Sequence, residues 1–167
     1  TKAAFANGGA ASFPAAVRPV EDELARLAQA FCARAHDFAS VLKLGRTQLQ
    51  DAVPMTLGAE FAGFGSGVEQ DLRHLRAAVA ELAAVNLGGT AIGTGINAHE
   101  GYGACARAHL AEISGYPVRA ADDLIEASSD MGALVAVSAA LRRVALRLSK
   151  IGNDLRLLSS GPRAGLG

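Results

Sequence analysis

The residues best suited to chemistry lie in the segment Gly45-Arg46-Thr47-Gln48. A hydroxyl on Thr47 stands beside an amide on Gln48, and such a pair on a loop can bind a carboxylate through neutral hydrogen bonds. Arg46 could add a positive charge. The alternative is a tight turn in which Thr47 and Gln48 cap neighbouring helices. The residues alone favour the turn and leave carboxylate binding open.

Other polar clusters predict neither a metal site nor a cofactor site. The glycine-rich stretch 88–95 resembles a phosphate cradle, but it lacks the Lys-Ser/Thr pair of a Walker loop and has no strand before it. His99 and Glu100 are adjacent, a spacing that gives no metal pair on one helix face. The two cysteines, Cys32 and Cys105, form neither a disulfide framework nor a metal signature, and we expect both to be small buried residues.

The segments around these residues predict long helices. An apolar face repeats at three- and four-residue steps from Val20, a second runs from Thr56, which can cap its helix, to Val85, and a short helix is expected near 104–114. The last helix is expected to start near Asp122 or Glu126 and to end before Gly161. Its apolar residues form a heptad seam: Leu134, Val137, Leu141, Val144, Leu148, Ile151, Leu155 and Leu158.

The pattern therefore predicts an all-α fold, an elongated bundle of long helices with no strands. Residues 1–19 are rich in alanine and glycine with two prolines, and we expect a loop or a frayed tail there. Residues 20–167 are expected to form one incomplete helical-bundle domain. Alanines spread around the last helix, so more than one of its faces should be buried, and this predicts a homo-oligomer.

Composition excludes several classes of partner. The formal net charge is zero, which argues against a nucleic-acid surface. No apolar run is long enough to span a membrane, and the first residues do not read as a secretion signal. The expected location is the cytoplasm.

Four segments in collinear order resemble the fumarase/aspartase superfamily. They are GRTQLQDAVPMTLGAEF (45–61), NLGGTAIGTGIN (86–97), DDLIEASSDMGA (122–133) and KIGNDLRLLSSGPRAGL (150–166). The resemblance covers residues 20–167 and implies the central helical domain of that fold. Fumarases typically carry His after the Thr of the first motif, whereas aspartases commonly carry Gln, as this chain does at Gln48. The resemblance therefore favours the aspartase branch.

The resemblance implies a lyase that eliminates ammonia from L-aspartate to give fumarate. Thr47 matches a ligand of the substrate carboxylate, and Gln48 takes the neighbouring place in the site. In this family a serine on a glycine-rich loop removes the proton, and the match places that loop beyond Gly167, so no catalytic residue is expected in this chain. Family sites are assembled from three subunits of a tetramer, and this partial copy is expected to be inactive alone. The alternatives are a class II fumarate hydratase and a non-catalytic helical scaffold.

Overall fold

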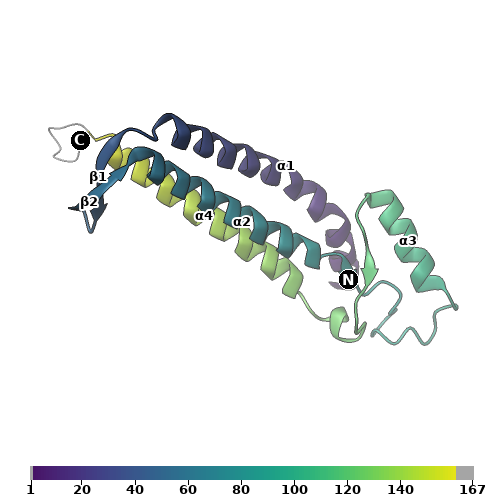
Figure 1. Cartoon of the computed structure of the whole chain (residues 1–167). Coiled ribbons are helices and arrows are strands. Elements are labelled where there is room, and N and C mark those ends of the chain that lie inside the picture. The colour runs from purple at the N-terminus through teal and green to yellow at the C-terminus, as the bar shows by residue number, and fades with distance from the viewer. Residues whose placement is uncertain (1, 161–167) are drawn as a thin grey trace. The chain divides into compact units, whose positions relative to one another are not determined.

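The computed structural model describes the backbone of residues 2–160 and the side chains of residues 12–160. Backbone contacts divide the chain into two compact units, each built from two segments. The first unit comprises Thr1–Glu21 and His74–Ala140, and the second comprises Asp22–Arg73 and Leu141–Gly167. The four α-helices seen in the described part of the chain confirm the predicted helical class (Figure 1).

Helix α1 spans Lys2–Asp37. The structure differs here from the expected loop or frayed tail over residues 1–19, because the helix continues through Pro14 and Pro19. Seven of the first nineteen residues are alanines, the strongest helix formers, and their propensity offsets the two glycines and two prolines. The division of the chain into a tail and a domain at residue 20 stays a prediction.

An antiparallel hairpin follows α1, where the sequence predicted a polar loop and no strands. Strand β1 spans Leu42–Thr47 and β2 spans Gln50–Thr56, with Thr47 opposite Gln50. The hairpin leads directly into α2, Leu57–Glu81. Thr56 caps α2 as expected, because its Oγ1 accepts a hydrogen bond of 3.0 Å from the backbone N–H of Ala59.

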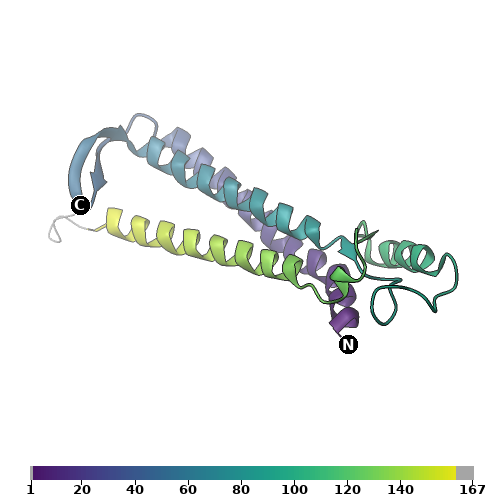
Figure 2. The same cartoon turned by 90° about the horizontal axis from the view of Figure 1, so that it is seen from below.

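In the second unit the helices run side by side (Figure 2). They pack through aromatic rings and a buried carboxylate. Phe31 on α1 makes edge-to-face contacts with Phe61 and Phe64 on α2, with ring centroids 6.1 and 5.7 Å apart. Asp71 on α2, whose side chain is 1% exposed, accepts hydrogen bonds from Arg143 and Arg147 on helix α4, Gly132–Leu158.

Helix α4 spans Gly132–Leu158, which begins later than predicted. The Oδ1 atom of Asp123 accepts hydrogen bonds from the backbone N–H groups of Ile125 and Glu126, and the chain then forms only a 3₁₀ turn, η1, Glu126–Ser128. A short side chain that bonds the nearby backbone competes with helix formation. The apolar seam of α4 is partly covered: Val137, Val144 and Ile151 are buried, whereas Leu148 is 37% exposed.

The rest of the first unit is a glycine-rich segment between short elements. Strand β3 (Ala84–Val85) pairs in parallel with β4 (Arg119–Ala120), and α3 spans Tyr102–Ser114. Tyr116 donates a hydrogen bond of 2.7 Å from its hydroxyl to the carbonyl of Val79. Burial, together with the charge of Glu21, raises the pKa of the Tyr116 hydroxyl above its ordinary value.

The structure also tests the expectations for the glycine-rich segment and for the two cysteines. The glycines of residues 86–103 predict no regular helix there, and the structure has none over residues 86–101, although α3 begins at Tyr102. The expectation of buried cysteines was wrong, because Cys32 and Cys105 are both exposed free thiols. Among the described helices, none has the length and apolar character needed to cross a bilayer.

Candidate functional site at the hairpin tip

The hairpin turns through two residues, Gln48 and Leu49, which both have positive φ angles of 53° and 62°. Positive φ at both central residues is the mark of a type I′ turn, whose twist matches that of the two strands. Such turns favour Asn and Gly, because a Cβ atom makes this conformation costly. Here neither residue is a glycine, so the rest of the hairpin must hold the turn.

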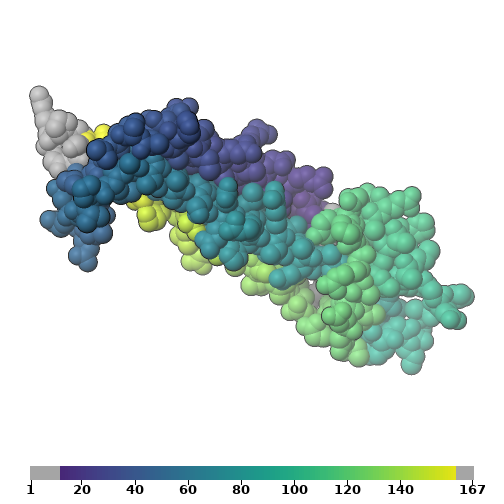
Figure 3. Space-filling model, in the orientation of Figure 1, coloured from purple at the N-terminus to yellow at the C-terminus, as the bar shows by residue number. Residues whose placement is uncertain are grey.

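The candidate ligands of a substrate carboxylate lie at this tip. Thr47 is the last residue of β1, and Gln48 is the first residue of the turn. Both residues are exposed. The space-filling view shows the hairpin at the molecular surface on the face that it presents (Figure 3). The hydroxyl and the amide are therefore adjacent in the chain and accessible to a small molecule.

A bulge below the tip depends on a glycine. The register shifts between Leu44 and Arg46, so that two residues of β2 oppose Gly45. Gly45 is buried, and a Cβ atom there would lie 3.2 Å from the carbonyl oxygen of Val53 and 3.1 Å from the sulfur of Met55. Bulges of this kind redirect side chains and are common beside functional sites.

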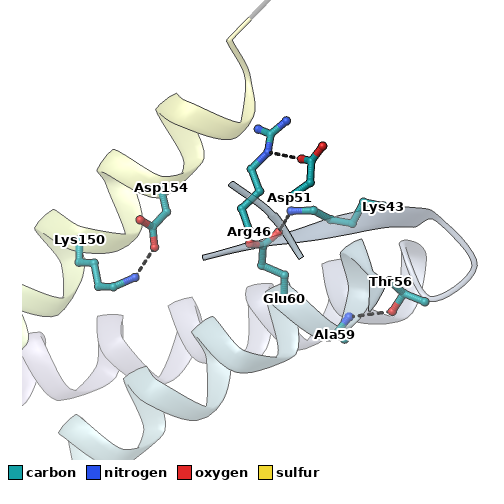
Figure 4. A network of polar contacts seen from close by, with 8 residues as sticks. All are labelled: Lys43, Arg46, Asp51, Thr56, Ala59, Glu60, Lys150 and Asp154. Atoms are coloured by element: carbon teal, nitrogen blue, oxygen red, sulfur yellow. Dashed lines mark hydrogen bonds and ion pairs between the residues drawn. The ribbon is translucent and has the colours of Figure 1, made fainter. Parts of the chain in front are cut away.

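Two ion pairs hold the strands, and the sequence did not point to them. Lys43 on β1 contacts Glu60 on α2 at 2.5 Å, with both side chains mostly buried. Arg46 faces Asp51 across the hairpin, with 3.6 Å between Nε and Oδ1 (Figure 4). Lys43 and Glu60 are seventeen residues apart in the chain, and Arg46 and Asp51 are five apart. The hairpin and its connection to α2 bring the partners together. Neither pair shows a spacing that marks it in the sequence.

A cavity of about 470 Å³ lies in the second unit beside these pairs. Its lining combines charged and aliphatic side chains: Val41, Lys43, Leu44, Arg46, Asp51, Leu57 and Leu158. Thr47 and Gln48 do not line it, so the two predicted ligands lie outside this cavity.

The other polar residues of the described chain form no metal site, and two of them bond the backbone. Within the described residues, His, Cys, Asp and Glu side chains form no group of three that could hold a metal ion. His99 bonds the backbone carbonyl of Glu100 through its Nδ1 atom. Ser128 donates a hydrogen bond of 2.7 Å to the carbonyl of Leu124 and accepts one from Asn86, so it is a structural contact.

Comparison with known proteins places the chain in a family. A family model described as lyase matches residues 12–167. The chain is 62% identical over 141 residues to the aspartate ammonia-lyase of Pseudomonas aeruginosa and 52% identical over 145 residues to that of Escherichia coli. These matches cover 84% and 87% of this chain. The chain spans about 30% of the length of each curated relative.

Solved structures agree with the fold. A fumarate lyase:delta crystallin from Brucella melitensis superposes with a TM-score of 0.91 at 48% identity, covering 97% of this chain and 35% of that one. A class II fumarase from Schistosoma mansoni superposes with a TM-score of 0.79 at 29% identity, covering 86% of this chain and 33% of that one. The chain therefore belongs to the lyase family, the fumarase/aspartase superfamily that its four motifs predicted.

Proposed function

We propose that this chain supplies the carboxylate-binding hairpin of an aspartate ammonia-lyase, which eliminates ammonia from L-aspartate to give fumarate. The observation that carries the proposal is the exposed Thr47-Gln48 pair at the tip of a turn that its own residues do not favour. The 62% identity to an aspartate ammonia-lyase over most of the chain supports the choice of reaction.

We assign Thr47 and Gln48 the role of binding a substrate carboxylate, and neither residue transfers a proton. The hydroxyl of Thr47 and the amide N–H of Gln48 donate hydrogen bonds to one substrate carboxylate. When a base outside this chain removes the proton next to that carboxylate, negative charge builds up on its oxygens, and fixed donors then stabilise the transition state more than the substrate. The full site is completed by other chain segments in a homotetramer in the cytoplasm, a compartment that suits the two free cysteines.

A chimera tests the reaction. This chain replaces the matching segment of the P. aeruginosa enzyme, and fumarate absorbance is followed with L-aspartate and, separately, with L-malate. We expect fumarate from aspartate. A chimera that assembles and acts only on malate would favour the class II fumarate hydratase, and one that acts on neither would favour the helical scaffold. The purified 167-residue chain alone is expected to release no fumarate at aspartase rates.

Substitution of Thr47 tests its role in the same chimera. Thr47→Val keeps the shape and removes the hydroxyl, and the loss of one such donor should cost about 3 kcal/mol, roughly a hundredfold in kcat/KM. Thr94→Val is the matched control, since Thr94 is also exposed and lies in the glycine-rich segment of the first unit. Equal activity of the two variants would show that Thr47 does not bind the substrate.

A further inference from the structure

The turn at the hairpin tip is costly for its residues. Gln48 and Leu49 both adopt left-handed φ angles, and a residue with a Cβ atom enters that region only when its surroundings impose it. Leu49 is also 62% exposed, so no burial of its side chain offsets the cost. The structure around the turn must therefore hold it in place.

The base of the hairpin is well anchored, but the anchor is distant from the tip. Lys43 ties the start of β1 to Glu60 of α2, and the backbone N–H of Leu57 bonds the carbonyl of Val41 at 2.8 Å. Above these contacts the bulge at Gly45 interrupts the ladder. The bulge separates the tip from its anchored base.

Between the bulge and the turn lies the cross-strand pair Arg46–Asp51. It is one register position below Thr47 and Gln50, which flank the turn. Side chains at facing positions on two strands interact directly, and opposite charges there stabilise the pairing. Figure 4 shows Arg46 and Asp51 pointing toward one another. Because successive residues of a strand point to opposite faces, the alternation of β1 puts Thr47 on the other face of the hairpin.

We propose that Asp51 is a positioning residue, which acts through Arg46 to hold the left-handed Gln48-Leu49 turn and so presents Thr47 and Gln48 to a dicarboxylate. The inference rests on the proposed function for its ligand, but the coupling of Asp51 to the turn does not. A cross-strand ion pair changes the equilibrium between strand pairings by up to about fivefold. Removal of Asp51 should therefore raise the population of other turn conformations by up to about that factor.

Nuclear magnetic resonance of the whole 167-residue chain tests the proposal. Carbon chemical shifts and N–H to Hα couplings at Gln48 and Leu49 report the left-handed population, and amide shifts during titration with fumarate report binding. We expect Asp51→Asn to lower the left-handed population and to weaken the fumarate response by up to about fivefold. Asp51→Glu, which keeps the charge, should retain part of both.

A second substitution that restores the turn distinguishes a positioning role of Asp51 from a direct contact of Asp51 with the ligand. Leu49→Gly favours the same turn without the ion pair, so the double variant Asp51→Asn/Leu49→Gly should recover both the turn and the fumarate response. Asp154→Asn is the control, because it breaks an ion pair with Lys150 within α4 and should leave the turn unchanged.

Several outcomes would overturn the proposal. One is an unchanged turn in Asp51→Asn, and another is a weaker fumarate response that Leu49→Gly does not restore, since Asp51 would then act on the ligand itself. If fumarate shifts no amide at Thr47 or Gln48 in the unmodified chain, the hairpin does not bind a dicarboxylate by itself, and the aspartate assay of the chimera decides the proposed function. The response of the turn to Asp51→Asn then decides the positioning role alone.

Discussion

Asp71 shows how one residue joins two helices. Its side chain is almost fully buried, whereas the side chains of its partners Arg143 and Arg147 are 39% and 31% exposed. The arginines therefore keep part of their hydration while the carboxylate loses its own. Burial raises the pKa of Asp71, but the hydrogen bonds and charges of Arg147 and Arg143 outweigh burial and hold this pKa below 3.8.

Asp71→Asn should lower the free energy of unfolding by about 3 kcal/mol, because two guanidinium groups lose their shared partner in a largely buried contact. Chemical denaturation followed by circular dichroism measures the change. Asp154→Asn, which removes an exposed partner of Lys150 on α4, should change stability by no more than about 0.5 kcal/mol. Similar losses in the two variants would contradict this account.

The contact of Asp71 with its two arginines also predicts that stability depends on pH. The folded pKa of Asp71 lies below its unfolded value of 3.8, so its contribution to stability is complete above that value. The contribution is lost as the pH falls through the folded pKa. The difference in unfolding free energy between the unmodified chain and Asp71→Asn should be constant from about pH 7 to pH 5 and shrink below pH 3.8. A difference that already shrinks near neutral pH would point to another group.

At the scale of elements, two glycines of α2 predict opposite results for one substitution. A Cβ atom at Gly58 would lie 2.4 Å from the carbonyl oxygen of Ala35, at the close approach of α2 to the end of α1. At Gly63 it would meet nothing within 4 Å. Gly58→Ala should therefore cost about 2 kcal/mol or more by overpacking. Gly63→Ala should stabilise the helix by roughly 0.5–1 kcal/mol.

Thermal unfolding of the two variants checks these signs, and each variant is the control for the other. Gly58 lies in the first turn of α2 and Gly63 in its interior, but the helix propensities of glycine and alanine differ by only about 1 kcal/mol. A larger difference between the two variants therefore reports the steric contact with α1. A stabilised Gly58→Ala variant would mean that the two helices separate easily at this crossing.

The sequence predicted the helices well because periodicity is a local signal. The apolar repeats located α2 and α4. The hairpin was missed because the residues around Gly45 show no regular alternation and the turn carries neither Asn nor Gly. Its formation depends on contacts such as Lys43–Glu60, which join residues that no local pattern relates.

The candidate site was predicted in part. Thr47 and Gln48 were identified from their types and from the motif around them, and the structure adds that they stand together at an exposed tip. Their roles stay predictions. Asp51 was not identified as a partner of Arg46, because a facing position in a hairpin is known only once the register and its bulge are known.

At the scale of the whole molecule, Leu146 provides a test of the proposed oligomer. Its side chain is 63% exposed on α4, and a leucine at such a position would be buried where a second chain packs on the helix. Leu146→Glu should therefore lower the molar mass measured by light scattering after gel filtration, whereas Gln70→Glu, at an exposed polar position of α2, should not. A monodisperse monomer for the unmodified chain would contradict the oligomer itself.

Tyr116, whose hydroxyl donates a hydrogen bond to the carbonyl of Val79, is an intrinsic fluorophore of the first unit. The chain has no tryptophan and two tyrosines, Tyr102 and Tyr116, and both belong to the first unit. The phenylalanine cluster around Phe31 and Phe61 belongs to the second unit. Tyrosine fluorescence therefore follows the melting of one unit, and the near-ultraviolet bands of the clustered phenylalanines follow the other. Two unfolding curves from one unlabelled sample would reveal whether the units melt together or in sequence.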